Sequence, residues 1–146
     1  MNILLLQREG IDLHRTLLTS ETSRNILRFY RPRDTGYGVL VESSSLGGSL
    51  SLVSELKWYV RRYVACVLFE FSGHRYCTQQ LAQEVYEREI RLQDPWPFKK
   101  LIGVREGAIR RTVWIEEESA PDVRGALSRE MDDVFEVWAS STEVPG

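Results

Sequence analysis

The sequence predicts an α+β fold: a single domain over residues 1–146 in which two β-hairpins form a mainly antiparallel sheet, packed against a helical pair and a C-terminal helix. Three observations predict this class. Two stretches, 25–41 and 99–118, each hold β-prone runs on both sides of turn residues. Between them, apolar residues recur at three- and four-residue steps, the spacing of one helix face. Strands and helices grouped in this way are typical of α+β proteins.

The first third of the chain is predicted to form a strand, a helical segment and a hairpin. Residues 2–7 (NILLLQ) are a short apolar run that suits a buried strand, with a helix as the alternative. Residues 11–18 place apolar side chains near helical spacing. The runs 25–30 and 37–41 flank the sequence RPRDTG, whose proline and glycine supply turn geometry. We therefore expect the first hairpin here.

The middle of the chain is predicted to form two helices. Eight apolar residues recur at helical steps: Val53, Leu56, Val60, Tyr63, Val64, Val67, Leu68 and Phe71. The segment 63–71 (YVACVLFEF) is also β-prone, so a strand there is the alternative to the favoured helix. Thr78 suits the N-cap of a second helix that runs to Ile90. The prolines of DPWPF (94–98) end that helix.

The last third is predicted to form a second hairpin and the C-terminal helix. Apolar runs at 101–104 and 109–115 flank the turn sequence REGA. Ser119, followed by Pro121 and Asp122, is typical of a helix start. The expected apolar stripe of this helix consists of Leu127, Met131, Val134, Phe135 and Trp138. We expect Trp58 and Trp138 in the core, because each lies on the apolar side of its predicted helix.

Composition and cysteine content predict a cytoplasmic protein. Hydrophobic residues make up 42% and charged residues 27% of the chain, as in soluble globular proteins. The longest uncharged apolar run, 63–69, is far shorter than the ~20 residues of a membrane span. The first residues lack the basic start and cleavage site of a signal peptide. Two cysteines make no disulfide framework, which favours a reducing compartment.

Cys77 and His74, in the sequence HRYC, most resemble a reactive site. A cysteine at a helix N-terminus has a lowered thiol pKa, and His74 or His14 would be its base. Together with Cys66 these residues could also form part of a zinc site, but no Cys-x-x-Cys or His-x-x-x-His pair is present. We interpret HRYC as the turn between two helices. The sequence thus predicts no catalytic residue, metal or cofactor, with a cysteine-dependent enzyme as a less favoured alternative.

Charge divides unevenly along the chain. Residues 1–104 hold 14 Lys and Arg against 11 Asp and Glu, whereas residues 105–146 hold 5 against 10. Clustered charge steers an oppositely charged partner, so we predict that the acidic C-terminal third binds a basic protein. Two aromatic residues of the proline-rich loop would serve as anchors if they are partly exposed, although they could instead fill gaps in the core. The predicted partner-binding residues are Glu116, Glu117, Glu118, Asp122, Asp132, Asp133, Glu136, Trp96 and Phe98.

An alternative hypothesis is RNA binding. Arg24 and Arg28, next to Phe29 and Tyr30, could contact phosphates while the aromatic rings stack on bases. On a strand these arginines and those of the following turn would occupy two faces, which makes a poor groove. The isoelectric point near 5.8 also lacks the usual basic footprint. The favoured hypothesis therefore expects no direct contact with nucleic acid and none with a membrane.

The Arg-rich chain, with its acidic segments EEES and REMDDVFEVW and no catalytic constellation, resembles the immunity proteins of bacterial contact-dependent inhibition and polymorphic toxin systems. The resemblance is one of type and carries no shared motif. It implies a cytosolic, non-enzymatic protein that forms a one-to-one complex with a cognate basic toxin domain. That toxin would be a nuclease, such as a tRNase, whose active site the acidic surface would cover.

Overall fold

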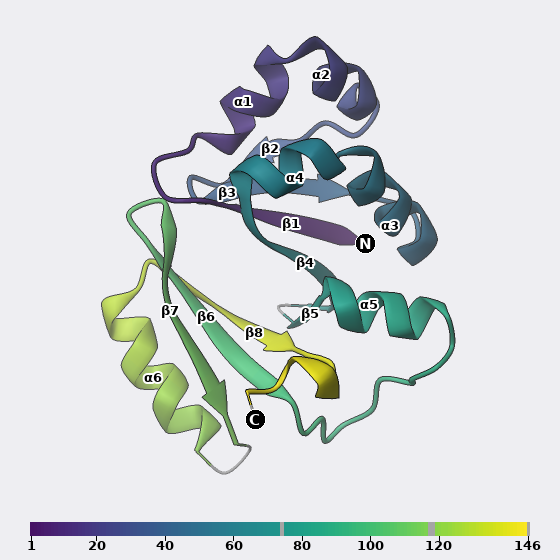
Figure 1. Ribbon diagram of the computed structural model, residues 1–146. Coiled ribbons are helices and arrows are strands. Elements are labelled where there is room, and N and C mark those ends of the chain that lie inside the picture. The colour runs from purple at the N-terminus through teal and green to yellow at the C-terminus, as the bar shows by residue number, and fades with distance from the viewer. Residues whose placement is uncertain (74, 117–118, 146) are drawn as a thin grey trace.

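The central element is an eight-stranded sheet in the order β2-β3-β1-β4-β5-β8-β6-β7 (Figure 1). The computed structural model describes residues 1–73, 75–116 and 119–145. The strands within these residues are β1 (Asn2–Gln7), β2 (Arg33–Asp34), β3 (Gly38–Glu42), β4 (Val64–Ser72), β5 (Arg75–Thr78), β6 (Lys99–Arg105), β7 (Ala108–Ile115) and β8 (Asp133–Trp138). The helices are α1 (Leu13–Thr19), α2 (Glu21–Leu27), α3 (Leu46–Glu55), α4 (Lys57–Tyr63), α5 (Gln79–Tyr86) and α6 (Ala120–Glu130), followed by the short 3-10 helix η1 (Ser141–Glu143). The β5–β8 pair is parallel and the other neighbouring strands are antiparallel, which confirms the predicted α+β class.

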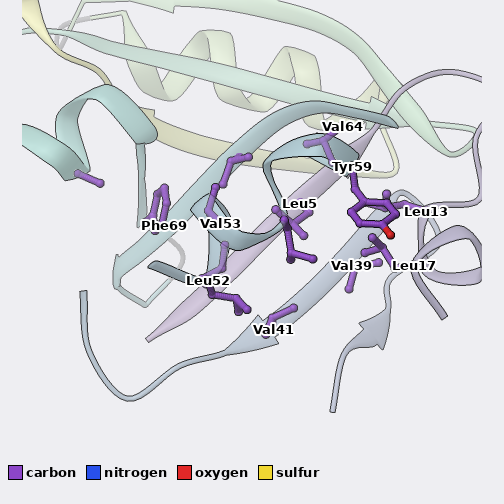
Figure 2. Packing of buried hydrophobic residues seen from close by; sticks show 14 of the residues in the cluster. Leu5, Leu13, Leu17, Val39, Val41, Leu52, Val53, Tyr59, Val64 and Phe69 are labelled. Atoms are coloured by element: carbon purple, nitrogen blue, oxygen red, sulfur yellow. The ribbon is translucent and has the colours of Figure 1, made fainter. Parts of the chain in front are cut away.

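Side chains of β1 alternate between two apolar clusters, because successive residues of a strand point to opposite faces. Ile3 and Leu5 belong to the cluster that α1–α5 cover, together with Leu13, Val39 and other residues drawn in Figure 2. Leu4 and Leu6 belong to a second cluster on the opposite face. The first strand is therefore buried on both sides, which explains why its sequence is apolar almost throughout.

The second cluster joins the two halves of the sheet. It places Leu68 of β4 with Ile102 of β6 and Phe135 of β8. The Gln7 side chain reaches across the same junction, where its Nε2 donates to the Gly107 carbonyl oxygen at 2.7 Å. A third cluster seats α6 on β6 and β7 through Leu127. The sheet is thus curled so that its halves share a core, while helices cover its outer face (Figure 1).

Several local predictions are confirmed. The Thr78 hydroxyl caps α5, since it accepts a hydrogen bond from the Leu81 backbone N–H at 3.2 Å. The predicted second hairpin is β6–β7, whose turn contains Glu106 and Gly107, both with positive φ. Helix α6 begins after Ser119 and has proline in its first turn. These features depend on residues close together in the chain.

The first predicted hairpin is wrong in its first strand. Residues 25–27 belong to α2 and residues 28–30 to the turn that follows it, and the hairpin is instead formed by β2 and β3. Ser23 and Leu27, which lie four residues apart, are both buried, and the Ser23 hydroxyl donates to the Leu17 carbonyl oxygen of α1. Packing of one helical face against α1 and the sheet therefore overrides the β propensity of this segment.

The favoured helix over 63–71 is also wrong, and the strand alternative is correct. Helix α3 ends at Glu55 and α4 at Tyr63, and the chain continues from Val64 as β4. Val67 and Phe69 face the cluster under the helices, whereas Leu68 faces the second cluster. A strand that is apolar on both faces satisfies helical spacing as well, so periodicity alone could not separate the two structures.

The predicted C-terminal helix is too long, and so is the second predicted helix. Helix α6 ends at Glu130, and the expected apolar positions from Val134 to Trp138 lie on β8 instead. Strand β8 is inserted between β5 and β6, a non-local pairing that local sequence does not reveal. Helix α5 ends at Tyr86 rather than Ile90, and Arg88 adopts a positive φ.

Of the helices described, none combines the length and apolar character required to cross a bilayer.

Candidate functional site

The predicted acidic residues that the structure describes lie near the two ends of α6 and on β8. Glu116 and Asp122 are exposed near the start of α6, and Glu117 and Glu118 lie outside the described residues. Asp132 and Asp133 follow its other end. A helix of 11 residues is about 16 Å long. The described acidic side chains therefore form two groups rather than one continuous surface.

Asp132 and Asp133 are engaged within the molecule. The Asp132 carboxylate accepts a hydrogen bond from the Glu106 backbone N–H at 2.9 Å, which ties the start of β8 to the β6–β7 turn. The Asp133 carboxylate accepts one from the Tyr37 hydroxyl at 3.0 Å. Burial, and then this hydrogen bond, raise the pKa of Tyr37 well above its ordinary value. Both carboxylates thus contribute to the internal order of the fold.

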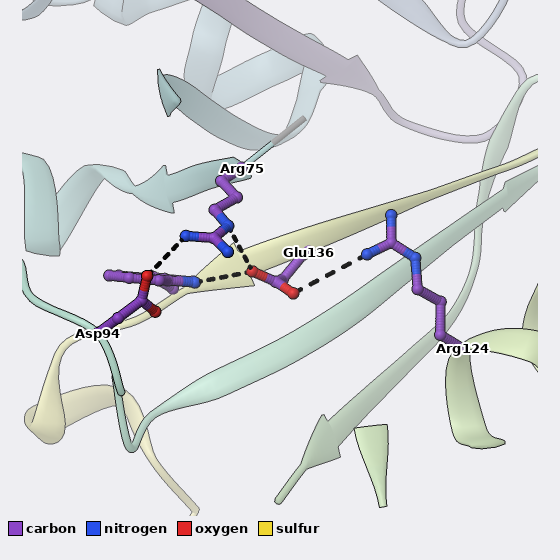
Figure 3. Close-up of polar contacts among 5 residues, drawn as sticks. Arg75, Asp94, Arg124 and Glu136 are labelled. Atoms are coloured by element: carbon purple, nitrogen blue, oxygen red, sulfur yellow. Dashed lines mark hydrogen bonds and ion pairs between the residues drawn. The ribbon is translucent and has the colours of Figure 1, made fainter. Parts of the chain in front are cut away.

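Glu136 is an internal ion-pair centre (Figure 3). Its side chain is 17% exposed. One carboxylate oxygen accepts a hydrogen bond from the Trp138 indole N–H at 3.0 Å and lies 3.6 Å from Arg75 Nε. The other oxygen lies 3.9 Å from Arg124 Nη1 on α6, and Arg75 also pairs with Asp94 at 2.9 Å. Glu136 therefore links β8, β5, α6 and the proline-rich loop.

The two predicted aromatic anchors are half-buried. The Trp96 ring stacks parallel to Trp138, with ring centroids 5.7 Å apart, and its indole N–H donates to the Ala139 carbonyl oxygen at 2.9 Å. The Phe98 ring meets Trp96 edge-on at 6.2 Å. Trp138 is buried as predicted. Trp96 therefore packs against the buried cluster that contains Trp138 and covers one side of it.

Cys77 faces the core rather than solvent. It is 3% exposed on β5, and burial, with a smaller contribution from Glu143, raises the pKa of its thiol to about 12. Burial also raises the pKa of Cys66, to about 11. The thiolate is the reactive form of cysteine, so both environments oppose nucleophilic chemistry. His74 lies outside the described residues.

The potential metal ligands do not converge in the part of the chain that the structure describes. No group of three or more His, Cys, Asp or Glu residues there is arranged to hold a metal ion. His14 lies on α1, where its Nε2 is 3.3 Å from the Pro32 carbonyl oxygen. Cys77 belongs to the apolar cluster beneath the helices.

The residues of the alternative RNA hypothesis lie on α2 and in the loop that follows it. Arg24 and Arg28 are exposed. Phe29 is 81% exposed, with the Arg28 guanidinium 4.6 Å from its ring centroid. Phe29 and Tyr30 line a shallow hollow with Arg31, Arg33, Leu40, Glu42, Ser43 and Ser44. Glu42 places a negative charge in the same hollow.

Trp58 is exposed, so the prediction that it lies in the core is wrong. The Trp58 side chain is 53% exposed, whereas Tyr59 is buried. The helical stripe breaks at Leu56, where α3 ends and α4 begins, so the phase of the buried face changes. The Arg62 guanidinium lies 4.1 Å from the Trp58 ring centroid, as expected of residues four apart on a helix.

Four cations surround Trp58, and we call this set the basic aromatic surface: Arg15, Lys57, Trp58, Arg61 and Arg62. All five residues are exposed. One hollow beside Trp58 is lined by Arg15, Thr16, Thr19, Ser20, Tyr59 and Tyr63, and a second by the three cations of α4. Among the residues described, none of the four cations forms an ion pair with a carboxylate. The sequence KWYVRR, with Trp58 and Arg62 four apart, is the signal that could have revealed it.

Comparison with known proteins identifies the family. Residues 1–104 match the model of a family of unknown function (DUF5804). No curated protein and no solved structure matches the chain. Since the family match covers well over half of the sequence, the chain belongs to this family.

Proposed function

We propose that this member of the family acts by binding an anionic macromolecule on the basic aromatic surface, without transforming it chemically. The observation that carries the proposal is the exposure of Trp58 among cations that have no described carboxylate partner. Clustered cations raise the rate of encounter with an anion. Tryptophan and arginine also dominate the energetics of protein interfaces. Exposed side chains of both kinds therefore support a binding role.

The position of the surface in the chain supports the same proposal. Arg15 and the three cations of α4 all lie within residues 1–104, the region matched by the family model. The predicted acidic residues, from Glu116 to Glu136, all follow that region. A function common to the family would rest on the matched region, where the basic aromatic surface lies.

The test is retention on a polyanion. We expect the protein to bind heparin–agarose at low salt, and the double variant Arg61→Glu, Arg62→Glu to elute at markedly lower salt, because surface charge controls such binding. Arg105→Glu with Arg129→Glu is the matched control, since both arginines are also exposed, form no described ion pair and lie outside the basic aromatic surface. Elution of the double variant together with the wild type, or the same shift in the control, would contradict the proposal.

A second candidate function is the neutralisation of a basic toxin in the cytoplasm. It is supported by Glu116 and Asp122, which are exposed near the start of α6 and form no ion pair among the described residues. Such carboxylates could meet a basic toxin domain, plausibly a nuclease, and cover its active site. This version requires no enzymatic activity of the chain itself.

The second candidate is tested with the product of the neighbouring reading frame. If that frame encodes a basic toxin domain, the two proteins should form a one-to-one complex whose association slows at high salt. Glu116→Lys with Asp122→Lys should slow the association further, while Asp34→Lys, on the edge strand β2, should not. A neighbouring product that does not bind, or that binds the double variant at the wild-type rate, would overturn this candidate.

A further inference from the structure

We infer that the anionic partner is single-stranded nucleic acid, with an unpaired base stacked on Trp58 and the adjacent phosphates held by the cations around it. The inference rests on the proposed binding function and names its partner class. Three features of the surface carry it: the exposed indole ring, the hydroxyl-rich hollow beside α1, and the three cations of α4.

The exposed indole ring distinguishes a nucleobase from an acidic side chain. The face of an aromatic ring carries negative charge in its quadrupole, so it attracts cations and stacks on other rings but repels a carboxylate. Arg62 lies against the Trp58 ring, and Tyr59 and Tyr63 meet it edge-on at 4.9 and 6.2 Å. The carboxylates of an acidic peptide could pair with the arginines, but they would make no favourable contact with the face of the Trp58 ring. A nucleotide can stack its base on Trp58 while its phosphate pairs with the arginines.

The hollow beside α1, which Trp58 also lines, offers hydrogen-bonding groups. The Thr16 and Thr19 hydroxyls donate to backbone carbonyl oxygens at 2.8 and 2.6 Å, which leaves their oxygens free to accept further hydrogen bonds. The Ser20 and Tyr59 hydroxyls share one hydrogen bond, so one of the two O–H groups is left to donate elsewhere. Arg15 adds charged donors. These groups suit the edge of a base or a ribose.

The opposite side of Trp58 suits the phosphate backbone. Lys57, Arg61 and Arg62 line the second hollow, and no carboxylate lines it. The Arg61 backbone is held in place because its carbonyl oxygen accepts a hydrogen bond from Arg8 Nη2 at 2.9 Å. Stacking on one aromatic side chain with cations along the backbone is the arrangement of proteins that bind single strands.

The same geometry disfavours a duplex. Paired bases in a helix are covered on both faces by their neighbours, so a protein ring can stack only on a base that is unpaired or flipped out. Trp58 is exposed on α4, where it lines one hollow together with Arg15 and Thr16 of α1. We therefore expect discrimination between single-stranded and double-stranded nucleic acid to depend on Trp58.

The test is fluorescence anisotropy of a labelled oligo(U) RNA of about 12 nucleotides, within the usual site size of single-strand binders. The full chain should bind it, and Trp58→Ala should weaken binding by about ten-fold, the effect of losing one stacked base. Trp58→Phe should restore most of the affinity. Phe29→Ala is the matched control, because Phe29 is also exposed beneath an arginine but lies outside the basic aromatic surface.

Salt dependence and competition separate this inference from the broader function. Between about 50 and 200 mM salt, Arg61→Ala should lower the slope of log affinity against log salt by about 0.7, as for one phosphate contact of a single strand. Duplex RNA of the same sequence and polyglutamate should compete weakly.

The outcomes fall into distinct classes. Arg-dependent binding of heparin or polyglutamate, combined with oligonucleotide binding that ignores Trp58→Ala, would overturn the nucleic-acid inference and leave the proposed function standing. Loss of binding on Phe29→Ala but not on Trp58→Ala would also overturn it. If neither heparin nor RNA binds the wild-type chain, the inference and the proposed function fail together.

Discussion

Charged residues on α4 and around β8 differ in how far they are paired within the fold. On α4, Lys57, Arg61 and Arg62 have no carboxylate within ion-pair distance among the described residues. Residues 1–104 as a whole hold only 14 Lys and Arg against 11 Asp and Glu. Around β8, where the sequence is strongly acidic, Glu136 is paired with two arginines and Asp133 accepts a hydrogen bond from Tyr37. The charge that a partner can use therefore depends on the contacts made within the fold as well as on the charge count of the sequence.

The largest expected effect is that of Leu68→Ala, which tests whether the two halves of the sheet unfold as one cooperative unit. Leu68 is fully buried on β4 and belongs to the cluster that joins both halves of the sheet. Leu68→Ala should lower the free energy of unfolding by about 3 kcal/mol, the usual loss for a buried leucine. Urea unfolding followed by tryptophan fluorescence and by circular dichroism should show coincident transitions.

Trp58→Ala is the control for that experiment, since Trp58 is half exposed and its stacking on Arg62 contributes at most about 1 kcal/mol. If Leu68→Ala split the unfolding into two separate transitions, the halves would not share a core. A Trp58→Ala variant as unstable as Leu68→Ala would show that Trp58 has a structural role.

The next effect tests the paired state of the acidic side. Glu136→Ala removes the acceptor of the Trp138 indole and leaves Arg75 and Arg124 with one partner fewer. Because Glu136 is mostly but not fully buried, we expect a loss of about 2 kcal/mol, below the range for a fully buried pair. Thermal or urea unfolding provides the measurement.

Two further variants serve as comparisons for the stability of Glu136→Ala. Glu136→Gln keeps an oxygen for the indole N–H and should fall between wild type and Glu136→Ala. Asp122→Ala, at an exposed site with no described ion pair, should change stability by less than about 0.5 kcal/mol. Equal effects of Glu136→Ala and Asp122→Ala would remove the distinction between internal and surface carboxylates.

The smallest effect concerns the hydrogen bond between Tyr37 and Asp133. Burial and this bond raise the pKa of Tyr37 above its ordinary value, so above about pH 10 the unfolded chain loses the phenolic proton before the folded one does. The free energy of unfolding should therefore decrease as pH rises above 10. At neutral pH, Tyr37→Phe should cost about 1 kcal/mol through the lost hydrogen bond.

The dependence of the free energy of unfolding on pH, measured above pH 10, is the measurement specific to Tyr37. In Tyr37→Phe the decrease above pH 10 should be shallower by up to about 1.4 kcal/mol per pH unit. Part of the slope should persist because burial, followed by Glu70, raises the pKa of Tyr76 to about 12. A variant with an unchanged slope, measured by urea unfolding at several pH values, would show that Tyr37 ionises freely in the folded protein.

The candidate site was only partly predictable. The positions of the acidic residues are plain in the sequence, but their separation by α6 and the burial of Glu136 depend on where β8 pairs. The exposure of Trp58 was missed because the break between α3 and α4 at Leu56, which changes the phase of the buried face, is not visible in the apolar spacing. The spacing of Trp58 and Arg62 was the available local signal.

By itself the sequence determined the features that depend on neighbouring residues: the strand β1, the Thr78 cap, the β6–β7 hairpin and the start of α6. Turn geometry and capping are short-range, so they can be derived without the rest of the chain. Only the tertiary structure decided that β4 and β8 are strands and that Trp58 is exposed, because β pairing and burial depend on elements distant in the sequence. An apolar residue can be assigned a face only when the element opposite it is known.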